Sequence, residues 1–203
     1  WTPAVPGTPP QDLGTLGGPC SQAAAINDHG QVAGWSYTAQ GQIHACLWAS
    51  GPNPVDLHGP SAGAYSQANA VNSLGQVVGT ADLIPGLGMG HAFLWSAAAG
   101  MRDLAPAIYE SAAFGINDAG LAVGSCTTFS CCAWQEGRLQ NLAALMTDLP
   151  QGYSLVWATA INQEGQIAGS AVTAGSGRAC LLTPVPAPPP RALPVGIPLL
   201  LLK

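Results

Sequence analysis

One ten-residue segment constrains the fold more than any other feature of the sequence, because it occurs four times at a constant spacing. The copies read AINDHGQVAG, AVNSLGQVVG, GINDAGLAVG and AINQEGQIAG, and their first glycines, Gly30, Gly75, Gly120 and Gly165, are 45 residues apart. A period of this length is typical of a propeller blade or another repeat architecture. The sequence therefore predicts four copies of one structural unit.

The composition favours strands over helices. The chain has 203 residues, of which 48% are hydrophobic, and this is enough for one domain with a substantial core. Only 7% are charged and the five basic residues are scattered, so the sequence lacks the basic surface that nucleic acids require. Exposed helix faces normally carry Glu and Lys, and the scarcity of both predicts an all-β protein.

Each repeat contains candidate strands on either side of an Asn-x-x-Gly turn. The Asn side chain accepts backbone hydrogen bonds, and the glycine takes the left-handed conformation that the hairpin requires. The second strand has an interior glycine, Gly34 in the first repeat, which indicates a bulge or a close approach of two backbones. The third strand reads HACLW or HAFLW in the first two repeats, and the fourth carries an Asp-Leu or Asn-Leu pair. The first three strands are predicted over 22–27, 31–36 and 44–48, then 67–72, 76–80 and 91–95, then 112–117, 121–126 and 130–134, and finally 157–162, 166–171 and 178–182.

The strands do not divide evenly among the repeats. The fourth repeat has no fourth strand, whereas residues 11–16 supply a strand with an Asp-Leu pair before the first repeat. Pairing of 11–16 with 178–183 would leave no open edge. We therefore predict an antiparallel β-propeller of four blades closed by the N-terminal strand, with a part of a larger propeller as the alternative. The predicted organisation is a proline-rich lead-in over 1–10, the propeller over 11–183, and a proline-rich tail with a short apolar end over 184–203.

Three linked motifs, DLGTLGG, AIND-x-GQVAG and HAFLW, closely resemble the bacterial HAF repeat, which is regarded as an extracellular repeat and has no assigned activity. The resemblance covers residues 11–183. Only His91-Ala92-Phe93 matches the His-Ala-Phe triplet in full. The resemblance implies a repeat architecture and an extracellular or cell-envelope location in bacteria, and it brings no catalytic residue with it.

The two ends of the sequence bear on location. The sequence begins at Trp1 without a methionine or a signal segment, so we expect either a removed leader or a fragment. It contains no apolar run of about 18 residues, so no membrane-spanning helix is predicted. Residues 184–203 resemble a weak form of the C-terminal sorting tails of exported bacterial proteins; a disordered tail or a truncated end is the alternative.

Six cysteines allow a disulfide. Cys126 and either Cys131 or Cys132 flank the shortest loop between a second and a third strand, and an exported protein permits a bridge there. We take Cys126–Cys131 as the candidate pair. The alternative is that the cysteines at the position of Phe93 in the other repeats, Cys46, Cys132 and Cys180, are buried apolar residues.

The recurring polar residues favour structural roles over catalysis. His44 and His91 begin the third strand in different repeats, and Asp12, Asp56 and Asp103 recur with Asn141, as expected for turn and cross-strand hydrogen bonds. The Cys and His residues lack paired metal-binding spacing, and the hairpins lack the acidic spacing of a calcium loop. No nucleophile elbow, P-loop or zinc-protease motif is present. The sequence predicts no metal site, no cofactor and no catalytic residue.

The candidate binding surface consists of the loops that vary among the repeats, since variable surface loops commonly carry function. In a propeller, the loops that follow the second and fourth strands share one face. In this sequence they contain aromatic and acidic residues suited to bind glycans or peptides, namely Tyr37, Tyr65, Tyr109, Tyr153, Phe129, Asp82, Glu110 and Asp148.

The sequence thus predicts a secreted or cell-surface module that binds a glycan or a peptide without catalysis. A propeller-type enzyme acting on glycans is the first alternative, because Asp82, Glu110 and Asp148 offer the carboxyl pair that glycoside hydrolysis needs. A purely structural repeat of the cell envelope is the second.

Overall fold

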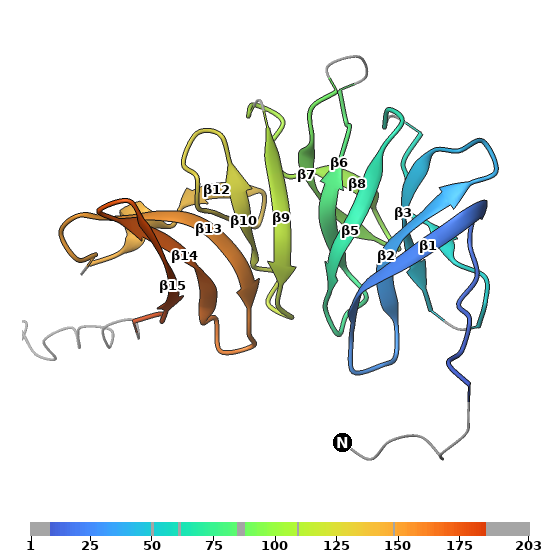
Figure 1. Cartoon of the computed structure of the whole chain (residues 1–203), viewed down its shortest axis with the longest axis horizontal. Helices are drawn as coiled ribbons and strands as arrows, with labels where there is room; N and C mark the ends of the chain where they lie inside the picture. The colour runs from blue at the N-terminus through green and yellow to red at the C-terminus, as the bar shows by residue number, and fades with distance from the viewer. Residues whose placement is uncertain are drawn as a thin grey trace, which may run out of the picture.

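The fold is an arc of four antiparallel sheets, as Figure 1 shows for the computed structural model. The structure describes residues 9–49, 51–60, 62–84, 88–108, 110–147 and 149–185. Nearly all of the predicted lead-in over 1–10 and tail over 184–203 therefore lies outside the described residues. Within the described part, no helix is long and apolar enough to cross a membrane.

Each sheet is formed by strands that are consecutive in the chain. The first contains β1 (Gly17–Ile26), β2 (Val32–Thr38), β3 (Ile43–Trp48) and β4 (Val55–Asp56), and the second contains β5 (Ser66–Val71), β6 (Val77–Ala81), β7 (His91–Ser96) and β8 (Gly100–Asp103). The third contains β9 (Ser111–Ile116), β10 (Ala122–Cys126), β11 (Cys132–Gln135) and β12 (Arg138–Asn141), followed by the 3-10 turn η1 (Ala143–Leu145). The fourth contains β13 (Tyr153–Ile161), β14 (Ile167–Thr173) and β15 (Ser176–Leu182). The described chain thus confirms an all-β fold of repeated sheets and the absence of a fourth strand from the last one.

The Asn-x-x-Gly turns form the predicted hairpins. In the first sheet, Asn27 Oδ1 accepts hydrogen bonds from the backbone N–H groups of His29 (3.1 Å) and Gln31 (2.9 Å). Gly30 has a φ of 75°, in the left-handed region that favours glycine. The same side-chain oxygen bonds the residue four positions on at Asn72, Asn117 and Asn162.

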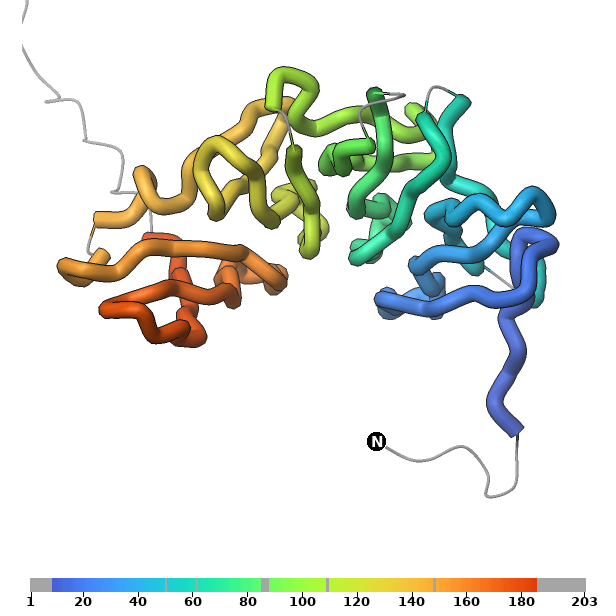
Figure 2. The backbone as a smooth tube through the Cα atoms, turned by 45° about the horizontal axis from the view of Figure 1, so that its top comes forward, coloured from blue at the N-terminus to red at the C-terminus, as the bar shows by residue number. Residues whose placement is uncertain are grey.

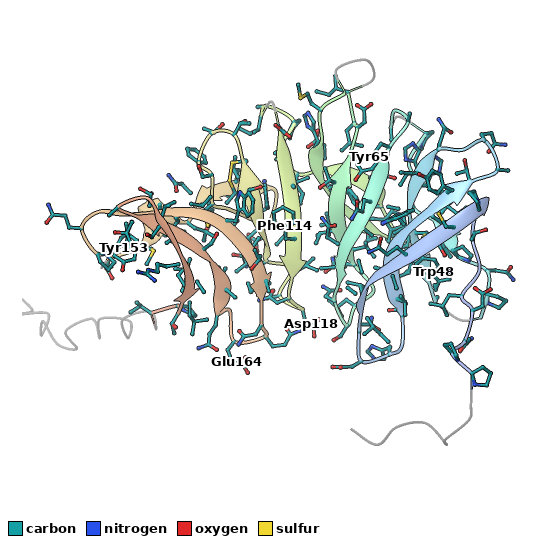
Figure 3. The ribbon with its side chains drawn as sticks, in the orientation of Figure 1. Trp48, Tyr65, Phe114, Asp118, Tyr153 and Glu164 are labelled. Carbon is teal, nitrogen blue, oxygen red and sulfur yellow. A yellow bond between two sulfur atoms is a disulfide. The ribbon has the colours of Figure 1, made fainter. Side chains whose placement is uncertain are left out.

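Three of these asparagines also join neighbouring sheets, and the sequence pattern did not predict these contacts. Asn27 Nδ2 donates to the backbone oxygen of Asn72 (2.8 Å), Asn72 Nδ2 to that of Asn117 (3.0 Å), and Asn117 Nδ2 to that of Asn162 (3.4 Å). We call this series the asparagine ladder. It runs along the edge of the arc that carries the hairpins, where Figure 3 labels Asp118 and Glu164. In each of the first three repeats, one residue therefore closes a turn and fixes the spacing to the next sheet.

The interior glycines mark bulges, as predicted. The pairing of β5 with β6 shifts register between Ala68 and Ala70, so that Asn69 is an extra residue opposite the region of Gly79. A side chain at Gly79 would overlap the backbone oxygen of Gln67. The same overlap exists at Gly34, Gly124 and Gly169, each against the first strand of its own sheet.

The core lies between the sheets in three clusters, one at each sheet-to-sheet interface. At the first interface, Ala33 and Leu47 of one sheet pack with Val71 and Val77 of the next. Equivalent residues form the other two clusters. We call the surface of a sheet that is directed toward the following sheet its leading surface and the opposite one its trailing surface; in the second and third sheets both surfaces are packed against a neighbour.

The predicted closure by residues 11–16 is not formed. Leu16 makes a parallel bridge with Thr38 and donates its N–H to Ser36 Oγ (2.8 Å), so this segment is bonded to the first sheet. The last sheet lies at the opposite end of the arc, as Figure 2 shows. The prediction was wrong because the number of strands in each repeat indicates only which sheet edge is unpaired. The position of residues 11–16 is set by their hydrogen bonds to the nearby first sheet.

Candidate functional site

A cavity of about 460 Å³ opens where the second, third and fourth sheets meet, and it is the candidate site. Glu110, Phe114 and Trp157 line it, with hydroxyl groups from Thr80, Ser125, Thr127 and Ser130. Phe114 lies on β9 near the middle of the arc in Figure 3. The lining therefore combines two aromatic rings, one carboxylate and several hydroxyls, a composition suited to a neutral polar ligand.

The two aromatic residues occur where the repeat is interrupted. Phe114 is the bulge residue of β9, and the equivalent residues of the other repeats are Ala24, Asn69 and Thr159. Trp157 follows a register shift in β13 and takes the place of Gln22, Gln67 and Ala112. Its side chain is 57% exposed, and a large apolar side chain exposed in a cavity wall is available to a ligand. The sequence signal for both residues was the change from small or polar to aromatic at one repeat position.

The cavity rim is held by backbone bonds and a disulfide. The N–H of Thr127 donates to the backbone oxygen of Glu110 (3.0 Å), and the N–H of Ser130 to that of Cys126 (2.8 Å). Cys126 is bridged to Cys132, with 6.2 Å between their Cα atoms. These contacts fix the loop that carries Glu110 against the β10–β11 turn.

The bridge to Cys132 corrects the predicted Cys126–Cys131 pair, and strand geometry gives the reason. Gly124 of β10 pairs with Cys132 of β11, and residues two apart share a face, so Cys126 and Cys132 lie on the same face. Cys131 points to the opposite face: it packs in the cluster between the third and fourth sheets, whereas Cys126 and Cys132 pack in the cluster between the second and third. Gly124 has no side chain to stand between the two sulfurs.

Reduction of this disulfide is expected to lower the melting temperature by about 5 °C. A short loop closed by a bridge constrains the unfolded chain by about 2 kcal/mol, and a chain of this size changes its melting temperature by roughly 2–4 °C per kcal/mol. Calorimetry with and without a phosphine reductant measures the shift. The Cys126→Ala/Cys132→Ala double variant is the control and should not respond to the reductant; an equal response of both proteins would contradict the assignment.

The sequence-predicted binding residues are distributed over several sheets. Tyr37 lies within β2 rather than in a loop, with its ring edge-to-face against Trp35 at 5.7 Å. Tyr65 and Tyr153 are each 36% exposed and lie on different sheets, far apart along the arc in Figure 3. Tyr109 and Asp148 lie outside the described residues.

Of the remaining predicted residues, Glu110 is the one that lines the described cavity. Asp82 follows β6, and its N–H donates to the backbone oxygen of Tyr65 (2.9 Å), so these two predicted residues are neighbours on the second sheet. Burial raises the pKa of the Tyr65 phenol, whose hydroxyl donates to Gln67 Oε1 (2.8 Å). Phe129 is 37% exposed in the β10–β11 turn.

The recurring Asp and Asn residues form the turns that the sequence predicted. The N–H groups two residues on donate to Asp12 (2.9 Å), Asp56 (2.9 Å), Asp103 (2.7 Å) and Asn141 (3.0 Å). The second carboxylate oxygen bonds a histidine on the adjacent strand, His44 Nδ1 at Asp56 (2.8 Å) and His91 Nδ1 at Asp103 (2.9 Å). These residues have structural partners, as predicted.

A second cluster contains His44, His58 and Ser66, and it too is structural. The rings of His44 and His58 stack with centroids 3.8 Å apart. His58 Nε2 lies 2.9 Å from the backbone oxygen of Gly63, which can only accept, so His58 Nδ1 accepts from the Ser66 hydroxyl at 2.8 Å. Ser66 is fully buried and out of reach of a substrate. Within the described ranges, no group of three or more His, Cys, Asp or Glu side chains is arranged to hold a metal ion.

The His58 environment predicts a pH dependence of stability. Burial, and then the neighbouring His44, lower the pKa of His58 below its ordinary value. The unfolded chain then binds more protons than the folded one as the pH falls below about 6.5, so this histidine destabilises the fold in acid and contributes nothing above that pH. We expect His58→Gln to show a smaller loss of melting temperature between pH 7 and pH 5 than the wild type. Parallel pH profiles of melting temperature for the variant and the wild type would contradict the assignment of the acid sensitivity to His58.

A further cavity, of about 490 Å³, lies between the third and fourth sheets and is lined by Leu121, Leu142, Ile167, Leu181 and Leu182 among others. Its described lining has no charged residue, so it offers less for recognition than the first cavity.

In comparisons with known proteins, no protein family, curated protein or solved structure matches the chain.

Proposed function

We propose that this chain is a non-enzymatic binding module, built as an arc of a β-propeller, that holds a glycan in the 460 Å³ cavity. The observation that carries the proposal is the pair Phe114 and Trp157, which interrupts the repeat and lines one cavity with Glu110 and several hydroxyls. Aromatic rings contact the C–H face of a sugar ring, while hydroxyl and carboxylate groups bond its hydroxyls.

The arrangement favours binding over hydrolysis. A glycosidase needs two carboxyl groups about 5–10 Å apart on either side of the scissile bond. Glu110 is the one carboxylate in the described cavity lining. A single carboxylate can orient a sugar hydroxyl but cannot supply both the acid and the base or nucleophile.

An extracellular or cell-envelope location is part of the proposal. The resemblance of the repeat to the HAF repeat supports it, and the Cys126–Cys132 bridge is compatible with an oxidising compartment. The propeller assignment rests on the 45-residue period, the four-stranded meander and the packing of successive first strands, since β1 contacts β5, β5 contacts β9, and β9 contacts β13.

The test is calorimetric titration with cellohexaose, chitohexaose, xylohexaose and mannohexaose. We expect Trp157→Ala and Phe114→Ala each to lower the affinity for the hexasaccharide that binds by about tenfold, since an aromatic contact contributes roughly 1–1.5 kcal/mol. Tyr65→Ala is the control, because Tyr65 is a partly exposed aromatic residue outside the described cavity lining, and it should retain full affinity.

Two outcomes would contradict the proposal. Loss of affinity in Tyr65→Ala with retention in Trp157→Ala would move the site to the tyrosines of the second and fourth sheets. Release of shorter oligosaccharides, abolished by Glu110→Gln, would show an enzyme.

A further inference from the structure

The two end sheets carry opposite halves of the interface that joins the sheets inside the chain. Each internal interface packs a leading surface against a trailing surface, and this occurs three times. The trailing surface of the first sheet and the leading surface of the fourth are left over. Figure 2 shows these two sheets at opposite ends of the arc, the first in blue and the last in orange and red.

The β1 part of the trailing surface of the first sheet is apolar and exposed, whereas Cys46 and Trp48 on the same surface are buried within the single chain. Ile26 is 68% exposed, whereas the equivalent residues Val71 and Ile116, which face a preceding sheet, are 8% and 7% exposed. Ala23 is also exposed, and its equivalents in the other three sheets, Ala68, Ala113 and Ala158, are fully buried. The side chains are thus already those of an interface.

The leading surface of the fourth sheet is uncovered in the same way. Leu181 is 63% exposed, whereas the equivalent Leu47 of the first sheet is 4% exposed. Ala168 is exposed, and its equivalents that face a following sheet, Ala33, Val78 and Val123, are fully buried. Large apolar side chains that are exposed here, but are buried at the equivalent positions of the other sheets, indicate a surface that binds a protein partner.

Two polar features match across the same two ends. The asparagine ladder ends at Asn162, whose Nδ2 bonds Gln166 of its own hairpin (2.8 Å), while Nδ2 of each of the three preceding asparagines reaches the next sheet. Among the residues that the structure describes, the fourth sheet has no strand after β15, and the 490 Å³ cavity opens beside Leu181 and Leu182 at that edge.

The missing strand has a counterpart in residues 11–16, before the first sheet. Asp12 accepts the N–H of Gly14, the turn that Asp56 and Asp103 form after the fourth strands of complete sheets. In those sheets the next residue, Leu57 or Leu104, donates its N–H to the backbone of the third strand, at Ala45 and Ala92. The equivalent donor at the start of the chain is Leu13, and the equivalent acceptor on β15 is Ala179.

We propose that a second copy of this chain docks head to tail, with the trailing surface of its first sheet on the leading surface of the fourth sheet. Residues 11–13 of the second copy then lie along β15, and Asn162 Nδ2 donates to the backbone oxygen of Asn27 of the second copy. A second copy is the occupant because one chain carries both halves of the interface. Two such contacts, related by a twofold axis, give a ring of eight sheets, within the range of known propellers.

The test is the molar mass of the purified chain by light scattering and sedimentation velocity over a range of concentrations. We expect about 41 kDa, twice the 20.5 kDa of the chain. Ile26→Asp and Leu181→Asp are each expected to give the single-chain mass, because a head-to-tail contact uses both residues. Both positions are already exposed in the single chain, so neither change disturbs its core.

Leu74→Asp is the matched control, since Leu74 is 69% exposed at a hairpin tip and belongs to neither end surface; it should leave the double mass unchanged. A single-chain mass of the wild type at every concentration would overturn the proposal. So would a double mass that only one of Ile26→Asp and Leu181→Asp abolishes, because that result indicates a contact between identical surfaces. Glycan binding does not enter these measurements, so the proposed function stands or fails separately.

Discussion

Gly79→Ala is expected to destabilise the protein by about 3 kcal/mol, which is a large effect for the addition of one methyl group. The added carbon would overlap the backbone oxygen of Gln67 and lie 2.8 Å from Cε1 of Phe93, which is fully buried. Neither neighbour can move at small cost, because Gln67 is held in the β5–β6 ladder and Phe93 in the core between the first two sheets.

Gly177→Ala is the control for this prediction. Gly177 also lies in a strand, β15, but a carbon added there meets nothing within 4 Å. We expect its stability to change by less than about 0.5 kcal/mol or to rise slightly, since alanine restricts the unfolded chain. Urea denaturation of both variants measures the difference in stability. Equal midpoints would show that the close backbone approach at Gly79 does not exclude a side chain there.

Asn72→Ala is expected to cost a similar amount, about 3 kcal/mol, for a different reason. Asn72 is 2% exposed and makes four hydrogen bonds: Nδ2 donates to Gln76 Oε1 (2.7 Å) and to the Asn117 backbone oxygen (3.0 Å), and Oδ1 accepts from the N–H groups of Leu74 (3.1 Å) and Gln76 (2.9 Å). Truncation leaves these partners unsatisfied in and between two sheets. Unsatisfied buried groups are costly because water does not replace the lost bonds.

The matched control is Asn162→Ala in the last hairpin. Asn162 is exposed and keeps the bonds within its turn, to the N–H and Oε1 of Gln166, but it has no contact with a further sheet in the described chain. We expect a loss of about 1 kcal/mol, as for a surface hydrogen bond. Both changes are made in the Leu181→Asp background, in which the chain is expected to be a single copy and Asn162 has no second copy to bond. The difference between the two variants then measures the inter-sheet part of the asparagine ladder, and equal losses would show that the ladder does not join the sheets.

The sequence predicted the repeating unit well because its determinants are local. Asn27 bonds the N–H groups of residues no more than four positions away, and Gly30 lies within the same turn. Gly34 lies against the strand that immediately precedes its own. Four copies of each pattern made the interpretation stronger than any one copy. The missing fourth strand of the last sheet was visible for the same reason.

Features that depend on distant parts of the chain were not predictable in this way. The bond from Asn27 to Asn72 joins residues 45 positions apart, and the sequence of a single hairpin does not predict it. The position of residues 11–16 depended on Ser36 and Thr38 rather than on the count of strands. The disulfide partner required the register of β10 against β11, because a shift of one residue exchanges the two faces.

The candidate site was only partly predictable from the loops. Glu110 was predicted because it lies in a loop that varies among the repeats, whereas Phe114 and Trp157 lie on strands and were not predicted. A comparison of equivalent strand positions among repeats would have identified both, since aromatic residues there replace Ala, Asn, Thr or Gln. In a repeat protein, the residues that depart from the pattern are the more informative ones for function.

The response of the tryptophan indole N–H signals to a bound hexasaccharide, followed by ¹⁵N-correlated NMR, tests whether the ligand occupies the 460 Å³ cavity. The chain has six tryptophans, and the signal of Trp157 is identified by its loss in Trp157→Phe. We predict that the Trp157 signal shifts in proportion to occupancy, while those of the buried Trp48 and Trp134 stay fixed. Saturating binding with an unchanged Trp157 signal would contradict the account, because the ligand would then occupy another part of the molecule.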